Sequence, residues 1–442
     1  MISPNDQLEA LLRGTEKVVP PDELAERLGE GRPLRVKLGL DPTAPAVTLG
    51  WAVVLRKLRQ FQELGHKAVL IVGDFTAQVG DPTDRDSQRK RLSAEEVRGY
   101  AGSVLAGFKK VLIWDDALLE VRYNSEWLAK IDMGGLLELT SKVTVAQMLE
   151  RGDFQTRFAA SQPISLMEFM YPLLQGMDSV AVDADIELGG SDQLWNNMMG
   201  RILQERYGER GQMVMTMPLL IGTDGRHKMS QSLGNYIAVD DDPADMFGKV
   251  MSIPDHLMPQ YYELATDLPE ATVKEITAGL AEGSLHPGDV KRLLANEIVR
   301  LYHPEAVVPR AQVIRPETVA WPTKVFPPDY TTTGELAFDK VFVKHEAPDD
   351  LPELPLPDGD DVWLPGFLRD HKMVASSSEG RRMINQGAVR INGEPVTQET
   401  VSSARLQNAT IQVGKRRHAR ISPGPIVVKS HVPRSEPRQG DD

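Results

Sequence analysis

The segment from Leu34 to Phe75 constrains the fold more strongly than any other part of the chain. It contains the apolar run LRVKLGL, the loop DPTAP, the helix-spaced stretch AVVLRKLRQFQELGH and a second apolar run, AVLIVGDF. Short apolar runs are typical of buried strands, and apolar residues three and four positions apart are typical of a helix. Strand, helix and strand joined by short loops form a βαβ unit, which implies a parallel sheet. We therefore predict an α/β fold that binds phosphates or adenosine at the carboxyl ends of its strands.

The rest of the chain divides by pattern into helical, irregular and compact segments. Residues 124–206 and 243–303 have mostly helical spacing, whereas 307–335 is rich in proline and irregular. Residues 346–361 hold seven acidic residues and four prolines with no basic residue, which predicts an extended linker. A compact unit follows at 362–421, and the last twenty or so residues are expected to be disordered.

The composition excludes several classes of protein. There is no cysteine among the 442 residues, so disulfides, thiolate zinc sites and cysteine nucleophiles are excluded. No run of eighteen apolar residues occurs, and the N-terminal stretch does not have the pattern of a secretory signal. We expect a cytoplasmic protein that does not enter membranes.

The charge is distributed unevenly. The net charge is −13, but residues 362–442 carry 13 Lys and Arg against 7 Asp and Glu, while the remainder carries 37 against 56. A basic module on an acidic body can steer an anionic partner to one end. A basic tail that is merely solvated would give the same count, so charge alone leaves both interpretations open.

Several segments resemble bacterial tyrosyl-tRNA synthetases in their order and spacing. They are KLGLDPTAPAVTLGWAVVLRKLRQFQELGH, VGDFTAQVGDPTDR, the pair YPLLQGMDSV and IELGGSDQLWN, and KMSQSLGNY. The likeness extends over nearly the whole chain from about Pro20, except for 307–335 and the last residues. The stretch LPGFLRDHKMVASSSEGRRMINQGAVRINGEPV resembles an S4-type RNA-binding domain, although a dimerisation module is an alternative.

The resemblance implies a division into domains. We expect a Rossmann-like catalytic domain with a helical insertion (1–235), a helical anticodon-binding domain (236–345, irregular at 307–335) and the acidic linker (346–361). A small α+β S4-like domain (362–423) and a disordered tail (424–442) follow.

The family reaction, as the resemblance implies it, joins tyrosine to ATP as an adenylate and then moves the tyrosyl group to the 3′ end of tRNA. No protein nucleophile is needed, because catalysis depends on positioning and on stabilising charge at phosphate oxygens. Tyr171, Gln175 and Asp178 are spaced four and three apart, so they share one helix face. Asp178 would accept a hydrogen bond from the phenol O–H of tyrosine. Phenylalanine lacks that hydroxyl and would be rejected, a discrimination for which tyrosyl-tRNA synthetase is itself the standard example. The amino-acid pocket is expected to comprise Asp41, Thr76, Asp81, Asn124, Tyr171, Gln175, Asp178 and Gln193.

The expected nucleotide site carries altered signatures. Where the family has His-x-Gly-His, this chain has Thr48-Leu49-Gly50-Trp51, and where it has Lys-Met-Ser-Lys-Ser, residues 228–232 are Lys-Met-Ser-Gln-Ser. Losing one transition-state donor costs about 3–4 kcal/mol, so losing both histidines should slow adenylate formation unless other groups compensate. We expect Lys228, Ser230 and Thr43 to be catalytic. The residues expected to bind ATP, with Mg²⁺, are Thr48, Gly50, Trp51, Arg85, Arg89, Gly190, Asp192 and Gln231. Gly189 precedes Gly190 and is expected to allow the same close approach of adenosine. His227 could compensate for the lost histidines, but an exposed loop histidine is the simpler interpretation.

RNA is the expected partner of the C-terminal unit, and a homodimer through the middle helical segment is expected from the resemblance. The candidate RNA-binding residues are Arg381, Arg382, Lys415, Arg416 and Arg417.

Three functions remain open from the sequence. The first is a tyrosine–tRNA ligase with a weakened or rewired ATP site. The second is a paralogue without aminoacylation that binds tRNA or a tyrosine-like amino acid. The third is an ATP-dependent ligase that couples a tyrosine-like acid to a small acceptor. Met177 is compatible with it, because a flexible methionine replaces the aromatic residue usual in the family. The S4-like domain argues against it, because a small acceptor needs no RNA-binding module.

Overall fold

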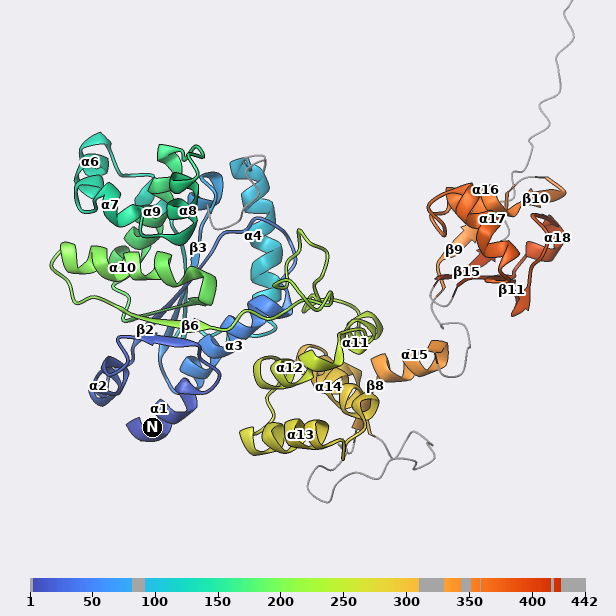
Figure 1. Cartoon of the computed structure of the whole chain (residues 1–442), viewed down its shortest axis with the longest axis horizontal. Helices are drawn as coiled ribbons and strands as arrows, with labels where there is room; N and C mark the ends of the chain where they lie inside the picture. The colour runs from blue at the N-terminus through green and yellow to red at the C-terminus, as the bar shows by residue number, and fades with distance from the viewer. Residues whose placement is uncertain are drawn as a thin grey trace, which may run out of the picture. The chain divides into compact units, whose positions relative to one another are not determined.

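The computed structural model describes residues 3–81, 92–309, 330–342, 351–357, 359–414 and 417–422. Contacts between residues divide the chain into two compact units, 1–335 and 336–442. Each unit has its own hydrophobic core. Figure 1 shows the helices and strands of both units.

A six-stranded sheet forms the centre of the first unit, in the order β1-β6-β5-β2-β3-β4. Only β1 runs antiparallel to its neighbour; the other pairs are parallel, as the βαβ pattern predicts. The strands are β1 (Lys17–Val19), β2 (Arg35–Leu40), β3 (Lys67–Val72), β4 (Leu119–Tyr123), β5 (Ile186–Gly190) and β6 (Met213–Met217).

Helices cover both faces of this sheet (Figure 1). Helix α3 packs against β2, β3 and β5, and α10 packs against β5, β6 and α9. Side chains alternate between the faces of a strand, so Lys37 of β2 points to α9, where it contacts Ser179. The helices of this part are α1 (Pro4–Leu12), α2 (Glu23–Gly29), α3 (Leu49–Glu63), α4 (Ala94–Phe108), α5 (Ser125–Leu128), α6 (Met133–Ser141), α7 (Val145–Met148), α8 (Gly152–Ala159), α9 (Leu166–Ala181) and α10 (Leu194–Arg206), with short 3₁₀ turns at Thr76–Gln78 and Ser191–Gln193.

Helix α9 begins and packs for reasons that are visible in its sequence. Ser165 caps it, and Glu168 completes a capping box with the Ser165 backbone. Gly176 lets α10 approach closely, because a Cβ there would lie 2.7 Å from the Leu203 Cδ1 atom and 3.2 Å from the Met199 carbonyl oxygen. The neighbouring Met177 packs into the same hydrophobic cluster.

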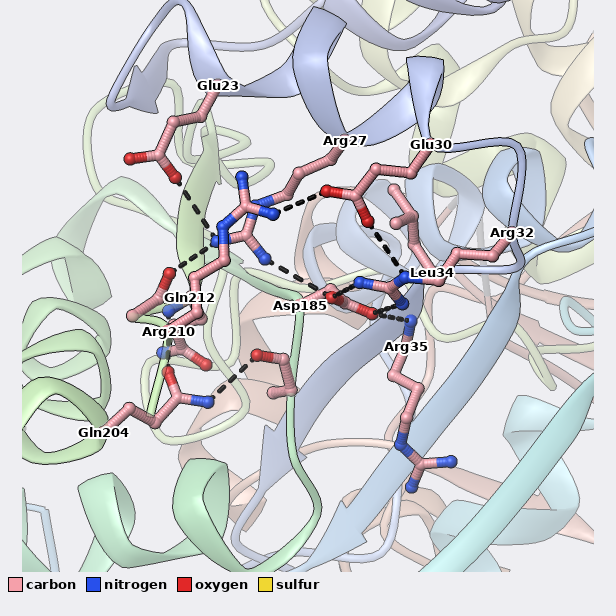
Figure 2. Close-up of polar contacts among 12 residues, drawn as sticks. Glu23, Arg27, Glu30, Arg32, Leu34, Arg35, Asp185, Gln204, Arg210 and Gln212 are labelled. Carbon is pink, nitrogen blue, oxygen red and sulfur yellow. Dashed lines mark hydrogen bonds and ion pairs between the residues drawn. The ribbon is translucent and has the colours of Figure 1, made fainter. Parts of the chain in front are cut away.

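A polar network fastens α2 to the amino-terminal ends of β2 and β5 (Figure 2). Asp185, just before β5, accepts hydrogen bonds from the Arg32 guanidinium (2.5 and 2.8 Å), the Arg27 guanidinium (3.3 Å) and the Arg35 backbone N–H (2.8 Å). Arg210 reaches α2 through Glu26 (3.0 Å). This network lies at the end of the sheet opposite to the carboxyl ends of its strands.

A helical segment completes the first unit. Its helices are α11 (Pro243–Met251), α12 (Met258–Ala265), α13 (Glu270–Glu282) and α14 (Pro287–Tyr302), with 3₁₀ turns at Asp255–Leu257 and Pro304–Ala306. The described ends of the proline-rich stretch are regular, since β7 (Val307–Pro309) pairs with β8 (Tyr330–Thr332). The buried Glu335 carboxylate then accepts from Asn296 (2.8 Å) and Arg292 (3.1 Å) of α14. Residues 310–329 lie outside the described part.

The second unit is a small α+β fold around a five-stranded sheet in the order β12-β11-β14-β15-β9. Asn392 and Gly393 both have positive φ (51° and 85°), which suits the tight hairpin between β11 and β12. Part of the stretch expected to be an extended linker is a strand of this sheet, because Glu353–Pro355 pairs in parallel with β15. The elements are α15 (Thr333–Phe342, which begins in the first unit), β9 (Glu353–Pro355), β10 (Asp361–Trp363), α16 (Leu364–Asp370), α17 (Ser377–Asn385), β11 (Val389–Ile391), β12 (Glu394–Pro395), β13 (Thr400–Ser402), α18 (Ser403–Leu406), β14 (Thr410–Val413) and β15 (Arg417–Ser422).

None of the helices in the described ranges is both long enough and apolar enough to cross a lipid bilayer. The expected disordered tail at 424–442 lies outside the described residues.

Candidate active site

Polar side chains gather at the carboxyl ends of the parallel strands. Asp41 follows β2, Thr76 follows β3, Asn124 follows β4 and Asp192 follows β5. Strands β3 and β4 lie on one side of β2 in the sheet, and strands β5 and β6 lie on its other side. The strand order therefore reverses between β2 and β5, which is where ligands of open α/β sheets bind.

A continuous hydrogen-bond network joins four of the predicted pocket residues. The Thr76 hydroxyl donates to Asp41 Oδ1 (2.6 Å), and the Tyr171 hydroxyl donates to Asp41 Oδ2 (2.9 Å). The Asn124 amide donates to Thr76 Oγ1 (2.9 Å). Gly73 makes this arrangement possible, because a Cβ atom there would overlap both Asp41 Oδ1 and Thr76 Oγ1. Burial raises the pKa of Asp41 to about 7, although the hydrogen bonds from Thr76 and Tyr171 oppose that change.

Asp178 lies at the buried end of the same network. Its carboxylate accepts from the Trp127 indole N–H (2.9 Å) and from the Asn124 amide (3.3 Å). Burial raises the pKa of Asp178 to about 7, while the nearby charge of Lys37 and the two hydrogen bonds lower it. Trp127 was not among the sequence candidates; its position in the segment YNSEWL, three residues after Asn124, was the available signal.

Gln175 is held by a buried ion pair that the sequence did not single out. Lys37 and Glu187 are register partners on β2 and β5, both almost wholly buried, with the Lys37 ammonium 3.0 Å from the Glu187 carboxylate. The same ammonium donates to the Gln175 carbonyl (3.1 Å) and to Ser179 Oγ (2.8 Å). The Gln175 amide donates to Glu187 (3.3 Å). Hydrophobic patterning predicts the strands but cannot predict that a lysine in one strand and a glutamate in another form an ion pair.

Asp81 and Gln193 meet on the other side of the pocket. The Gln193 amide donates to Asp81 Oδ2 (3.0 Å), and the Arg151 guanidinium lies 3.7 Å from Asp81 Oδ1. Asn196 donates to Gln193 Oε1 (3.0 Å). Each of the eight predicted pocket residues thus has a hydrogen bond to a neighbour in this region: Asp81 and Gln193 to each other, Gln175 to the Lys37–Glu187 ion pair within the strands, and the others in the network around Asp41.

The end of β5 approaches the second signature. Gly189 and Gly190 leave little space for side chains, since a Cβ at Gly190 would lie 2.8 Å from Asp192 Oδ1 and 2.9 Å from Leu219 Cδ2. The Lys228 ammonium lies 2.8 Å from Asp192 Oδ2. This contact joins a residue expected to bind ATP, Asp192, to one expected to be catalytic, Lys228.

The first signature forms the start of α3. Thr48 is the N-cap, and its hydroxyl accepts from the Trp51 backbone N–H (3.3 Å) while the residue is 2% exposed. The Trp51 ring packs beside Phe108, with 6.3 Å between the ring centroids. The Thr43 backbone N–H donates to the Asp41 carbonyl (2.8 Å) in the preceding loop.

The second signature lies directly against the first. The Gly50 backbone N–H contacts Met229 Sδ (3.3 Å), and the Gln231 side chain bonds to the Ala46 backbone. The Ser230 hydroxyl lies 2.9 Å from that of Ser232. His227 is exposed and its Nδ1 is 2.8 Å from Asp224, which agrees with a loop histidine.

Some candidates lie elsewhere. Arg85 and Arg89, expected near the phosphates, and Lys415 and Arg416, expected at RNA, fall outside the described residues. Arg381 and Arg382 are exposed on α17; the Arg381 guanidinium pairs with Glu399 (3.1 Å) and lies 5.4 Å from the Trp363 ring centroid. Arg417 begins β15 and bonds to the Met373 carbonyl (2.5 Å).

No group of three or more His, Asp or Glu side chains with the geometry to hold a metal ion occurs among the described residues.

Comparisons with known proteins identify the family of this chain. Residues 29–316 match the model of the tRNA synthetases class I (W and Y), and residues 362–401 match the S4 domain. A tyrosine–tRNA ligase of Moorella thermoacetica is 46% identical over 94% of this chain and 95% of its own length. One from Carboxydothermus hydrogenoformans is 47% identical over 94% and 97%, and tyrosine–tRNA ligase 2 of Vibrio parahaemolyticus is 43% identical over 96% and 100%.

Solved structures share the fold. A tyrosyl-tRNA synthetase from Aeropyrum pernix superposes with a TM-score of 0.57 at 20% identity, covering 69% of this chain and 94% of that one. A tyrosyl-tRNA synthetase from Archaeoglobus fulgidus, complexed with L-tyrosine, gives a TM-score of 0.56 at 22% identity, over 68% and 97%. On the strength of the two matched family models and the relatives that align over almost their whole length, this chain belongs to the tyrosyl-tRNA synthetase family of class I tRNA synthetases.

Proposed function

We propose that this chain is a tyrosine–tRNA ligase that activates tyrosine with MgATP and transfers the tyrosyl group to the 3′ end of tRNA. In the first step the tyrosine carboxylate attacks the α-phosphorus of ATP and pyrophosphate leaves. In the second step a 3′-terminal hydroxyl of tRNA attacks the activated carbonyl carbon and AMP leaves.

The observation that carries this proposal is the buried carboxyl of Asp178 at the end of the network from Asp41. As a carboxylate it accepts from Trp127 and Asn124 and has further lone pairs for a phenol O–H. A ligand without that hydroxyl would cover the carboxylate with an apolar ring edge and give it no further donor in place of water, which is costly.

The opposite end of the pocket suits an ammonium group. The charge of Asp81 adds to burial in raising the pKa of Asp41, so these two carboxyls repel one another. A cation bound between them would relieve that repulsion. An amino acid with a phenol at one end and an ammonium at the other therefore complements both ends of the site.

Groups suited to the phosphates lie next to this pocket. The 15-residue helix α3 directs its positive dipole end to this region, although the N–H groups of Leu49, Gly50 and Trp51 already have acceptors within the protein. Lys228 and Ser230 of the second signature supply a cation and a hydroxyl, and Asp192 can accept from ribose hydroxyls. Arg85 and Arg89 are proposed to assist.

One observation favours the second candidate, a paralogue with little or no activation. The Thr48 side chain is only 2% exposed, so although its O–H remains free to donate, it has little access to a ligand and is a poor substitute for a histidine donor. The loss of both imidazoles would then cost several orders of magnitude in rate, at about 10²–10³ for each donor.

The partners follow from the same proposal. The second unit would bind tRNA through Arg381 and Arg382, together with Lys415, Arg416 and Arg417, which follow more than thirty positions later in the sequence. Large apolar side chains are exposed along α6 to α9, which supports a homodimer through this segment. These side chains are Met133, Leu137, Val145, Phe158 and Leu166. We also propose a cytoplasmic location.

Tyrosine-dependent exchange between ATP and pyrophosphate tests the proposal. The unmodified chain is expected to show exchange, and a Thr48→His/Trp51→His double variant is expected to be faster, because it restores both donors. Exchange by the double variant alone would favour the paralogue. Silence from both, in protein that is folded by circular dichroism, would contradict the proposal.

The transfer step has its own test. An Arg381→Ala/Arg382→Ala variant should charge tRNA poorly and lose about two units of the salt dependence of tRNA binding, if each arginine contacts one phosphate. Its pyrophosphate exchange should be unchanged. An unaltered salt dependence would remove both residues from the RNA contact.

A further inference from the structure

Gln231 forms a reciprocal pair of hydrogen bonds with the backbone of Ala46. Its amide nitrogen donates to the Ala46 carbonyl oxygen (2.6 Å), and its amide oxygen accepts from the Ala46 N–H (3.2 Å). The two residues are 185 positions apart, so this contact joins two distant segments. Ala46 lies in the loop between β2 and α3, and Gln231 lies in the second signature.

A second contact ties the same two segments together one turn further along. The Gly50 N–H, in the first turn of α3, points at Met229 Sδ (3.3 Å). A Cβ at Gly50 would lie 3.4 Å from Met229 Cβ, an ordinary van der Waals distance, so the two segments pack directly against each other here. Leu49 and Val239 continue the attachment through backbone bonds to Ile237 and Val47 (both 2.8 Å).

The second signature loop is also shaped from within. The Asn235 side chain accepts from the Ser230 N–H (2.8 Å) and donates to the Lys228 carbonyl (3.2 Å). The Lys228 ammonium meanwhile reaches Asp192 at the end of β5 (2.8 Å). Residues 228–231 are therefore held on one side by Asn235 and on the other by Ala46, Gly50 and Asp192.

The chemistry of the side chain decides what this position can do. A glutamine amide is both donor and acceptor, so it can satisfy the N–H and the C=O of one residue at once. A lysine has only donors, so it could reach the Ala46 carbonyl but would leave the Ala46 N–H without this acceptor.

We propose that Gln231 is a positioning residue that clamps the second signature loop to the loop preceding α3, and that it does not serve as a contact to ATP. The clamp sets the position of Lys228 and Ser230 relative to the start of α3 through neutral hydrogen bonds. The expected effect of this clamp on ATP binding rests on the function proposed above, whereas the contact between Gln231 and Ala46 does not.

Hydrogen–deuterium exchange of the full chain without nucleotide tests the clamp directly. In Gln231→Met, which keeps the length of the side chain but has no amide, exchange in peptides covering 43–50 and 226–235 should become about tenfold faster, the size expected from losing two hydrogen bonds. Gln231→Lys should behave similarly at Ala46. Leu233→Ala is the matched control, because Leu233 is exposed in the same loop, and it should leave exchange in 43–50 unchanged.

Pyrophosphate exchange on the same variants separates the clamp from a direct role. A clamp predicts that Gln231→Met and Met229→Leu alter the KM for ATP in the same direction, since each removes one attachment of the loop. Unchanged deuterium exchange in Gln231→Met, with a loss of activity, would overturn the clamp in favour of contact with ATP. Faster deuterium exchange in a chain that shows no activity in any form would uphold the clamp and count against the proposed ligase.

Discussion

The carboxyls of Asp41 and Asp178 give the pocket a pH dependence. Burial raises the pKa of each to about 7, so both are largely protonated below that value and ionised above it. Only the ionised forms attract an ammonium and accept fully from a phenol. The KM for tyrosine in pyrophosphate exchange should therefore fall as the pH rises from 6 to 8. Asp178→Asn should raise the KM for tyrosine by about 10- to 100-fold, as expected for a hydrogen bond to a charged group. A KM for tyrosine that is independent of pH in the unmodified chain would contradict the predicted pH dependence.

Gly73 allows Asp41 and Thr76 to come into hydrogen-bond contact because it has no side chain. A Cβ atom there would overlap both the Asp41 carboxyl and the Thr76 hydroxyl, and would lie 3.1 Å from the Leu40 carbonyl oxygen. Gly73→Ala should therefore displace Asp41 and abolish tyrosine binding by calorimetry, at a cost of about 1–3 kcal/mol in the free energy of unfolding. Gly99→Ala is the control: it lies exposed in α4 with no atom within 4 Å of its Cβ. It should bind tyrosine normally and be slightly more stable.

At the scale of elements, the network around Asp185 fastens α2 to the sheet (Figure 2). Burial opposes ionisation of Asp185, but hydrogen bonds from Arg32 and from the Arg35 backbone, together with the charge of Arg27, hold its pKa below the usual range. A carboxyl with a lowered folded-state pKa stabilises the fold above its unfolded pKa of about 4, and that contribution is lost as the pH falls through the folded value.

Asp185→Ala should lower the free energy of unfolding at pH 7 by about 3 kcal/mol, because it leaves the buried Arg27 without a main partner. In urea titrations the difference from the unmodified chain should shrink toward pH 3. Glu26→Ala removes an exposed partner of Arg210 and should change stability by less than about 1 kcal/mol. A difference that is constant with pH would rule out ionised Asp185 as the cause.

At the scale of the whole molecule, the exposed apolar side chains of α6 to α9 bear on assembly. Leu137 is 65% exposed on α6, and Phe158 is 65% exposed on α8. A Leu137→Glu/Phe158→Glu variant should sediment as a monomer where the unmodified chain sediments as a dimer, because burying two carboxylates in an apolar interface is costly. Leu12→Glu, on the exposed side of α1, should remain dimeric. An unmodified chain that is monomeric at micromolar concentration would refute the proposed dimer.

The local sequence is sufficient to predict the elements that position the site. Strands β2 and β3 and helix α3 follow from apolar spacing alone, and the order of the motifs predicts the parallel sheet. Tyr171, Gln175 and Asp178 share a face of α9 because their spacing requires it. By contrast, the strand at Glu353–Pro355 could not be foreseen in an acidic, proline-rich stretch, because it pairs with β15, more than sixty residues away.

The sequence by itself determined the sheet, the helical segments and the residue types available for tyrosine and ATP, since periodicity and side-chain chemistry are local properties. Only the tertiary structure decided the contacts of those residues. Lys37 meets Glu187 because β2 and β5 are neighbours, the Trp127 indole of α5 donates to Asp178 of α9, and Gln231 bonds to Ala46, 185 positions away. These contacts depend on which segments the fold brings together, and hydrogen bonds act only over the short distances that such packing creates.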